Sequence, residues 1–446
     1  MLRVSTLLFT LLTAVSIFNS CVHIPNPFSG LPPGVWRGVL KLDGDRIAIG
    51  EVDPDEQVGK AIEEVTDGEL PFEFEVIYDN DTTFHIEIIN GDERINVPTK
   101  NITMALDRRT AKDTLTIDFP IYDSKIKAIY EEDIMEGEWI VENRGEPYAI
   151  KFAAFHGRGF RFTNLKKEPV MDISGKWAVT FGTNEDEPYP AIGEFKQEGN
   201  KVTGTFRTET GDYRFLEGTI QANKLYLSVF DGSHAFLFEA KILEDKSMIG
   251  TFRSGKHYKT TWEAVKDDKV TLKSPNDLTY LNEGYDRIEF AFPNPQGDTI
   301  SIDDEKYAGK AKLIQIMGTW CPNCRDETKF LAEYFKANPN PNLEVITLAF
   351  ERYRETDKAM AAIAEYKDFF GIDWEVLHAG YYDKKEAAQA LPMLNHILSY
   401  PTLIFIDQNN QVQKIHTGFN GPATSAYEGF VEEFEGDIKA LTIKAM

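Results

Sequence analysis

Two cysteines three residues apart are the part of this sequence best suited to chemistry. Residues 320–324 read Trp-Cys-Pro-Asn-Cys, after an apolar run at 311–317 and before a helix-forming segment at 325–337. A buried strand, a Cys-x-x-Cys pair and a helix in this order place the sulfur of Cys321 at a helix N-terminus, where free backbone N–H groups and the helix dipole favour a thiolate. A thiolate attacks disulfides, and Cys324, one turn further on, can close an intramolecular bridge. The pattern predicts a dithiol–disulfide redox site.

Two other uses of a cysteine pair fit this sequence less well. A zinc site needs a second pair of Cys or His ligands. The third cysteine, Cys21, is at the far end of the chain, and none of the eight histidines falls within ten residues of the pair. A structural disulfide across so few residues would constrain the unfolded chain little. We therefore expect redox chemistry with no metal and no other cofactor.

Further segments around the pair follow one family pattern. They are an entry segment at 290–302, the signature Gly-Thr-Trp-Cys-Pro-Asn-Cys at 318–324, a strand at 343–350, a helix within 356–370, and Tyr-Pro-Thr at 400–402 before an apolar run at 403–406. From about residue 278 onward the chain resembles a thioredoxin-fold domain of the membrane-associated thiol–disulfide oxidoreductase group (TlpA/ResA-like). The resemblance implies an α/β fold whose sheet is completed at 411–416 and whose last helix runs from about 425 to 443.

The resemblance also assigns residues to a substrate groove. In this superfamily the proline at the position of Pro401 follows a cis peptide bond and faces the active-site disulfide. Its missing N–H leaves the preceding backbone free to pair with an extended substrate. An ordinary proline at the start of a strand is the alternative interpretation. We expect Trp320, Pro322, Tyr400 and Pro401 to shape the groove beside Cys321.

An acidic residue on the predicted helix is the candidate general base. Thioredoxins carry a buried acid six residues before the first cysteine, where this chain has Gln315, which cannot take a proton from a thiol. The membrane-associated group instead has a glutamate three residues after the second cysteine, and Glu327 occupies that place. Because this spacing is close to one turn, Glu327 and Cys324 share a helix face, and a partly buried carboxylate with a raised pKa could deprotonate the resolving thiol. The alternative is a solvated residue among other charged side chains.

The N-terminus resembles an export signal. The apolar run at 4–18 is too short to span a bilayer and fits the apolar part of a signal peptide. It ends in Ile-Phe-Asn-Ser-Cys at 17–21, which resembles a bacterial lipoprotein processing site. We predict a signal peptide at 1–20, lipid attachment at Cys21 and a proline-rich tether at 21–33. A simple secretory signal is the alternative.

Composition limits the other possibilities. A chain of 446 residues is long for one core, so two or three domains are expected. The net charge of −24 argues against nucleic-acid binding, because a phosphate backbone would be repelled.

The region between the tether and the redox domain predicts β structure. Short segments rich in aromatic and β-branched residues recur from 34 to about 266, and Glu-Gly-Asn at 198–200 indicates a hairpin. We predict a sandwich or a small barrel, with a possible duplication because Gly-x-Trp occurs at both 34–36 and 175–177. The expected β domains are 34–168 and 169–268, followed by the thioredoxin-like domain at 275–446. His234 near Asp231 is interpreted as a turn histidine.

The expected fold is thus multidomain, all-β and then α/β. Segments 211–218 and 230–236 also resemble a region found ahead of thioredoxin domains in envelope proteins of Bacteroidetes-type bacteria. Together the resemblances imply a lipid-anchored, periplasm-facing enzyme that reduces protein disulfides and is regenerated by an unidentified envelope reductant. Its partners would be protein cysteine pairs and, through the lipid, the membrane. A scaffold protein whose β module is the working part, or a disulfide isomerase, is the alternative.

Overall fold

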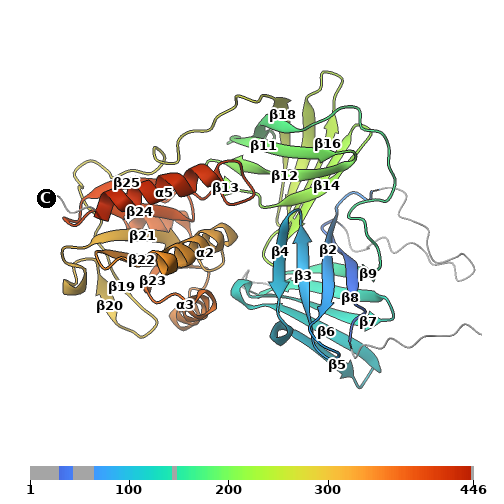
Figure 1. Ribbon diagram of the computed structural model, residues 1–446, viewed down its shortest axis with the longest axis horizontal. Helices are drawn as coiled ribbons and strands as arrows, with labels where there is room; N and C mark the ends of the chain where they lie inside the picture. The colour runs from blue at the N-terminus through green and yellow to red at the C-terminus, as the bar shows by residue number, and fades with distance from the viewer. Residues whose placement is uncertain (1–29, 44–64, 143–147, 443–446) are drawn as a thin grey trace, which may run out of the picture.

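The structure is a computed structural model that describes residues 30–43, 65–142 and 148–442. The predicted signal peptide and Cys21 lie outside these residues. Two β domains are followed by an α/β domain, as predicted (Figure 1). Within the described part of the chain, no helix is long and apolar enough to cross a membrane.

The first β domain is a nine-stranded antiparallel sheet in the order β4-β3-β2-β1-β9-β8-β7-β6-β5. Its side chains alternate between core and solvent, as in β3, where Phe84, Ile86 and Ile88 are buried and the residues between them are not. The strands are β1 Gly34–Lys41, β2 Glu69–Tyr78, β3 Phe84–Asn90, β4 Glu93–Val97, β5 Ile102–Asp107, β6 Lys112–Phe119, β7 Ser124–Glu131, β8 Ile134–Val141 and β9 Tyr148–His156, with short 3-10 helices at Thr99–Asn101 and Pro120–Tyr122.

The second β domain is a closed barrel. Its sheet runs β11-β10-β18-β17-β16-β15-β14-β12-β13, and β11 also pairs with β12, so the ring has no open edge between them. The β11–β12 hairpin turns at Gly199, at φ 63°, as the sequence predicted. The strands are β10 Gly175–Phe181, β11 Tyr189–Glu198, β12 Lys201–Thr208, β13 Gly211–Asp212, β14 Leu216–Gln221, β15 Lys224–Phe230, β16 Ala235–Ile242, β17 Met248–Ser254 and β18 Tyr258–Lys266.

The two β domains start in the same way. Gly34 and Gly175 both have positive φ, at 105° and 102°. The indoles of Trp36 and Trp177 each donate a hydrogen bond to the carbonyl four residues earlier, at 3.1 and 2.8 Å. In both sheets the first strand lies between the second and the last strand. These shared features support a duplicated β module.

The β domains are also packed together. The ring of Phe230 of the barrel packs at a tilt against that of Phe72 of the first sheet, at 4.4 Å between centroids, and belongs to the same apolar core. Ser228 on the same barrel strand donates a hydrogen bond at 2.5 Å to the carbonyl of Pro71. The two β domains therefore share a packed interface and form one unit ahead of the C-terminal domain.

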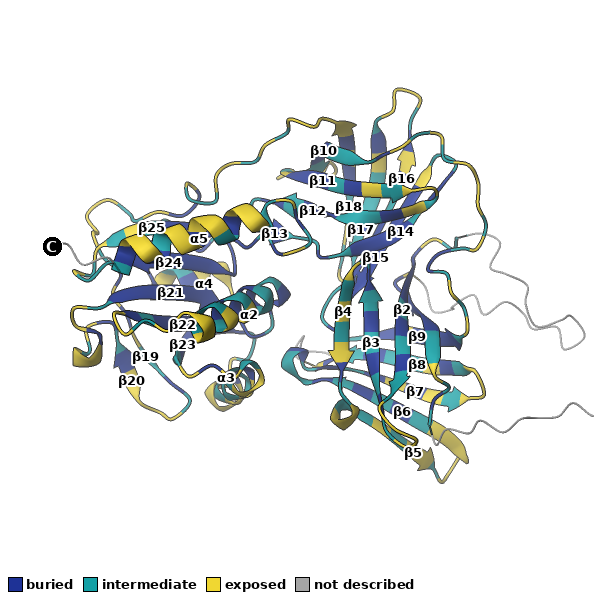
Figure 2. Ribbon diagram, in the orientation of Figure 1, coloured by how far each residue is buried: buried dark blue, intermediate teal, exposed yellow. Residues whose placement is uncertain are grey.

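The C-terminal domain has a mixed sheet in the order β23-β22-β21-β24-β25, with parallel pairing of its first three strands and antiparallel pairing of the last two. Every residue of β21 is buried, as expected for a central strand covered on both faces (Figure 2). Its elements are β19 Ala291–Pro293, β20 Thr299–Ser301, a 3-10 helix Glu305–Tyr307, β21 Ala311–Met317, α2 Pro322–Ala337, β22 Leu343–Glu351, α3 Thr356–Phe370, β23 Glu375–Tyr381, α4 Lys384–Ala390, β24 Thr402–Ile406, β25 Val412–Thr417 and α5 Tyr427–Thr442.

Helices cover both faces of this sheet. Leu313 belongs to the apolar cluster that contains the buried side chains of α5, whereas its neighbour Ile314 belongs to the cluster that contains those of α3 and α4. The predicted strands at 311–317, 343–350, 403–406 and 411–416 and the helices at 356–370 and 425–443 are confirmed to within a few residues. The helix predicted at 325 begins earlier, at Pro322, because proline is well suited to the first helical position. The sequence analysis did not identify β23 and α4.

Candidate active site

Cys321 caps the N-terminus of α2. Its Sγ accepts a hydrogen bond from the backbone N–H of Cys324 at 3.2 Å, and Pro322 takes the first helical position. The thiol of Cys321 also reaches the carbonyl oxygen of Tyr400, at 3.5 Å. Both cysteines are free. A donated N–H and the positive end of the helix dipole stabilise negative charge on this sulfur.

The predicted groove residues gather beside Cys321. The Tyr400–Pro401 peptide bond is cis, as the resemblance predicted. The Trp320 ring packs edge-on against Tyr400, at 5.7 Å between centroids, and its indole N–H donates to the carbonyl of Phe350 at 2.9 Å. Trp320, Pro322 and Tyr400 line a cavity of about 290 Å³ together with Cys321, whereas Pro401 is buried behind them.

Glu327 is fully buried and is not the solvated residue of the alternative interpretation. Its Oε2 accepts a hydrogen bond from the amide of Gln315 at 2.9 Å, while Oε1 has no hydrogen-bond partner among the described residues. Burial raises the pKa of Glu327 to about 8, although the hydrogen bond from Gln315 opposes the shift. Burial, followed by the hydrogen bond and charge of Cys321, raises the pKa of Cys324 well above its usual range. The helix α2 thus carries, three residues apart, a thiol that resists ionisation and a carboxyl group whose pKa is raised to about 8.

A second buried acid, Glu351, was missed by the sequence analysis. Its carboxylate accepts hydrogen bonds from the backbone N–H of Thr319 at 3.1 Å and from the Thr319 hydroxyl at 2.7 Å. Burial raises the pKa of Glu351 to about 7, against the effect of both hydrogen bonds. Glu351 ends β22, which runs parallel to β21, so both strands deliver residues to the same edge of the sheet. The only signal in the sequence was one acidic residue directly after an apolar strand.

The β region also contributes to the cavity. His234 and Phe236 of the barrel line the same cavity as Cys321. The Asp231 carboxylate accepts hydrogen bonds from the backbone N–H groups of Ser233 and His234, at 2.8 and 2.6 Å, so His234 does lie in a turn. Sequence reasoning could not find that this turn faces the cysteines, because the contact joins segments about ninety residues apart.

Cys321 is only 7% exposed, and residues 210–213 of the barrel line the same cavity as its side chain. This proximity of the barrel to Cys321 was not predicted from the sequence.

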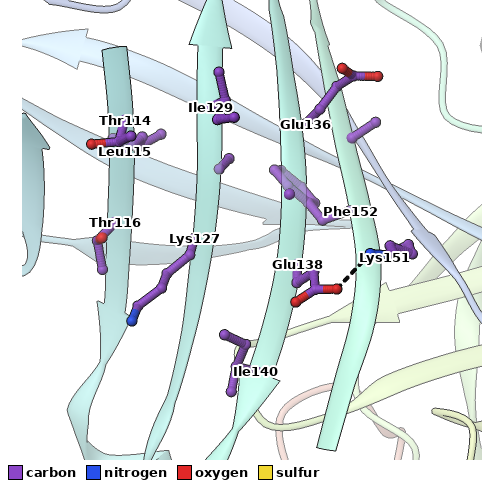
Figure 3. Close-up of a pocket in the computed structure, with 13 residues that line it drawn as sticks. Thr114, Leu115, Thr116, Lys127, Ile129, Glu136, Glu138, Ile140, Lys151 and Phe152 are labelled. Carbon is purple, nitrogen blue, oxygen red and sulfur yellow. Dashed lines mark hydrogen bonds and ion pairs between the residues drawn. The ribbon is translucent and has the colours of Figure 1, made fainter. Parts of the chain in front are cut away.

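A larger hollow than the one at Cys321 lies elsewhere. It measures about 910 Å³ and sits against β6, β7, β8 and β9 of the first β domain (Figure 3). Neither a cysteine nor a histidine lines it, and Lys151 and Glu138 form an ion pair across it at 2.6 Å. Thiol chemistry therefore belongs to the smaller cavity at Cys321.

Comparison with known proteins supports this location. The family model described as Redoxin matches residues 286–430. The chain is 26% identical over 141 residues to the thioredoxin-like protein YneN of Bacillus subtilis, which covers 31% of this chain and 73% of the relative. It is 22% identical over 138 residues to the thiol-disulfide oxidoreductase ResA of the same organism, which covers 31% of this chain and 69% of the relative.

Among solved structures, the chain is similar to a thioredoxin family thiol:disulfide interchange protein from Chlorobium tepidum TLS. The identity is 19%, the match covers 36% of this chain and 97% of that chain, and the TM-score is 0.27. The segment matched by the Redoxin model contains β21, the cysteine pair and the cis bond before Pro401. The C-terminal part of this chain is therefore a domain of the thioredoxin superfamily, in the TlpA/ResA-like group of thiol–disulfide oxidoreductases.

Proposed function

We propose that this chain reduces protein disulfides in the bacterial cell envelope, with Cys321 as nucleophile and Cys324 as resolving thiol. The observation that carries the proposal is the position of Cys321 Sγ at the N-terminus of α2, where it accepts the N–H of Cys324 at 3.2 Å. The name of the relative ResA, a thiol-disulfide oxidoreductase, supports the same class of chemistry, and YneN is named as thioredoxin-like.

The reaction has two exchange steps. The Cys321 thiolate attacks one sulfur of the substrate disulfide, whose S–S bond breaks and releases the other sulfur as a thiolate. Cys324 then loses its proton and attacks Cys321 Sγ, which breaks the mixed disulfide and releases the second substrate thiolate. The chain is left with a Cys321–Cys324 disulfide, and two electrons have passed to the substrate. A dithiol reductant of the envelope must return those electrons.

Glu327 is the proposed acceptor of the Cys324 proton. It lies one helical turn after Cys324, is shielded from water, and has a pKa of about 8, which suits proton transfer near neutral pH. Trp320, Pro322 and Tyr400 are proposed to form the surface that receives the polypeptide around the substrate disulfide, and the buried Pro401 is proposed to shape that surface through the backbone of Tyr400.

The compartment follows from the N-terminal sequence. We propose cleavage after residue 20, lipid attachment at Cys21, a tether at 21–33, β domains at 34–168 and 169–268, and a periplasm-facing thioredoxin-like domain at 275–446. The β region would then hold the redox domain away from the membrane surface.

Two cysteine variants test the chemistry. With Cys324→Ser, a substrate captured by Cys321 cannot be released, so mixed disulfides should accumulate in cells and be identifiable by mass spectrometry. Cys321→Ser, the matched control, should capture nothing and should lose insulin reduction. Full insulin reduction by Cys321→Ser would refute the assignment.

A further inference from the structure

A turn of the barrel occupies the groove beside Cys321. The hydroxyl of Ser399 donates a hydrogen bond to the carbonyl of Thr210 at 2.8 Å, and Gly211 forms a parallel β-bridge with Phe419. On the helix side, the amide of Asn323 donates to the carbonyl of Asp212 at 3.4 Å. These contacts lie on both sides of the cysteine, where an extended substrate would have to pair with the backbone.

The backbones approach too closely for another chain to lie between them. A Cβ added at Gly211 would lie 2.3 Å from Asn323 Nδ2, and one added at Gly418 would lie 2.7 Å from the carbonyl carbon of Thr210. Both glycines have positive φ, at 145° and 80°. The carboxylate of Asp212 also accepts the backbone N–H of Gly421 at 2.6 Å. The turn and the groove are therefore complementary surfaces.

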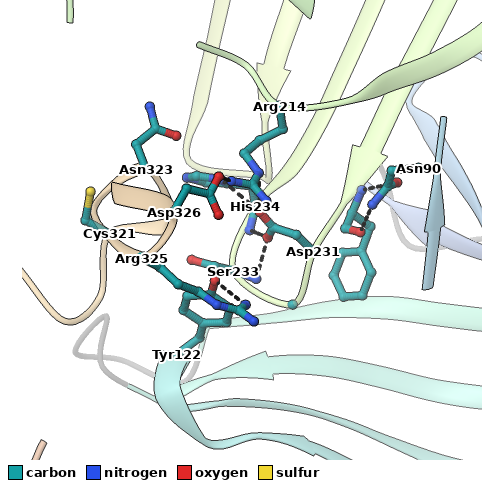
Figure 4. Close-up of polar contacts among 12 residues, drawn as sticks. Asn90, Tyr122, Arg214, Asp231, Ser233, His234, Cys321, Asn323, Arg325 and Asp326 are labelled. Atoms are coloured by element: carbon teal, nitrogen blue, oxygen red, sulfur yellow. Dashed lines mark hydrogen bonds and ion pairs between the residues drawn. The ribbon is translucent and has the colours of Figure 1, made fainter. Parts of the chain in front are cut away.

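Ion pairs of Arg214 connect this turn to the neighbouring domains. Its guanidinium forms ion pairs with Asp326 on α2, with Glu93 on β4 at 2.7 Å, and with Asp231 at 3.5 Å (Figure 4). Burial opposes the charged form, but the three acids raise the pKa of Arg214 well above its usual range. One side chain thus joins all three parts of the molecule. Other polar contacts across the same boundary are Arg325 to Tyr122, Tyr353 to Asp123 and Ser425 to Glu194.

With the turn in place, the cavity at Cys321 has walls from two domains. Tyr213, His234 and Phe236 form one side, and Trp320 and Tyr400 belong to the other. Its volume of about 290 Å³ is at the lower limit for pockets that take small molecules. A polypeptide strand cannot reach the sulfur through such a space, whereas a low-molecular-weight disulfide can.

We propose that the second β domain determines the substrate class of the redox site. In the docked arrangement Cys321 reacts with small disulfides only, and a protein disulfide reacts only after the turn at 208–214 has left the groove. This inference rests on the proposed function, because it assumes that Cys321 is the attacking thiol.

The test compares four full-length proteins in single-turnover reactions. Each is first reduced, then mixed with either bis(2-hydroxyethyl) disulfide or insulin, and the rate of Cys321–Cys324 disulfide formation is followed by alkylation and mass spectrometry. The proteins are the natural chain, Arg214→Ala, Gly211→Ala and the control Arg253→Ala, whose ion pair with Asp43 lies within the β region. Gly211→Ala keeps Arg214 and disturbs only the fit of the turn.

We expect both turn variants to raise the insulin rate by about tenfold or more, because minor conformations are populated at about 0.1–10% and each variant should raise the population of the undocked form. Their rate with the small disulfide should rise far less, and Arg253→Ala should match the natural chain with both substrates. Equal insulin rates in all four proteins would overturn the inference and leave the redox assignment intact. No oxidation by either disulfide in any protein would overturn both. A gain seen only in Arg214→Ala, together with loss of its thermal unfolding transition, would indicate unfolding and would also overturn it.

Discussion

Gln315 on β21 donates a hydrogen bond from Nε2 to Oε2 of Glu327 on α2, at 2.9 Å, in a layer that excludes water. The carbonyl oxygen of the same Gln315 side chain accepts the hydroxyls of Thr328 and Thr347, at 3.3 and 3.1 Å, so its orientation is fixed from both sides. Thioredoxins resembled by this domain carry an acid at the position of Gln315. Here the strand supplies a neutral amide and the helix supplies the acid, so in the proposed mechanism the proton acceptor lies on the helix that carries Cys324.

Glu327→Gln should slow resolution of the mixed disulfide by about a hundredfold, within the usual range for loss of a general base. A carboxylate accepts protons only when ionised, so the resolution rate of the natural chain should rise with pH through about pH 8, the pKa of Glu327. Glutamine does not titrate, and the variant should lose that inflection. Stopped-flow mixing with a disulfide substrate at a series of pH values measures both effects. An unchanged pH profile in the variant would remove Glu327 from the mechanism.

The same substitution should stabilise the fold. The folded pKa of Glu327, about 8, lies above its unfolded value near 4.5, so between these values the folded state holds a proton that the unfolded state has lost. The contribution of Glu327 to stability is therefore greatest below about pH 4.5 and is lost as pH rises to 8. Glu327→Gln should gain about 3 kcal/mol at pH 7 and much less at pH 5. Urea unfolding of the reduced proteins at both pH values measures the difference, and a gain that does not grow with pH would contradict the assigned pKa.

The indoles of Trp36 and Trp177, on the first strand of each β domain, should contribute to stability in the same way, because both donate a hydrogen bond to a carbonyl four residues upstream. Trp177→Phe removes the indole N–H that donates to the carbonyl of Ile173 at 2.8 Å, so this carbonyl loses its side-chain donor. The smaller phenyl ring also leaves a void in the core. We expect a loss of about 2–3 kcal/mol of unfolding free energy. Trp36→Phe should cost somewhat less, because its hydrogen bond is longer and only partly buried. Urea unfolding of each variant checks this, and a large loss in one module with none in the other would argue against equivalent modules.

The features that were predicted correctly from the sequence depend on residues that are close together in the chain. The strand at 311–317, the cysteine pair and the helix after it follow from an apolar run and from helix-start residues within about thirty positions. The hairpin at Gly199 is equally local, because a glycine with positive φ is required between two β-rich segments. These features depend on neighbours in the chain, so one sequence is enough to place them.

What the sequence did not predict was set by packing between distant segments. Glu351 and Thr319 meet only because β21 and β22 pair in parallel register. Arg214 and Asp326 are 112 residues apart, and no periodicity in the sequence links them. Charged residues on a turn and on a helix are usually solvated, so the burial of Arg214 beside Asp326 could not be inferred before the domains were seen to dock.

Substitutions of Glu351 test whether its hydrogen bonds with Thr319 are needed to position the loop before Cys321. The backbone N–H of Thr319 is buried, and Glu351→Ala leaves it without an acceptor, which should cost about 1–3 kcal/mol. Glu351→Gln keeps a carbonyl oxygen for that N–H and an amide for the hydroxyl, so it resembles the protonated acid and should be tolerated. Because Thr319 is two residues from the nucleophile, the alanine variant should also lower the rate at which Cys321 reacts with iodoacetamide at pH 7, whereas the glutamine variant should not. Urea unfolding and alkylation rates measured on the same preparations separate the two effects. Equal alkylation rates in both variants would show that the hydrogen bonds to Thr319 stabilise the fold without positioning the sulfur.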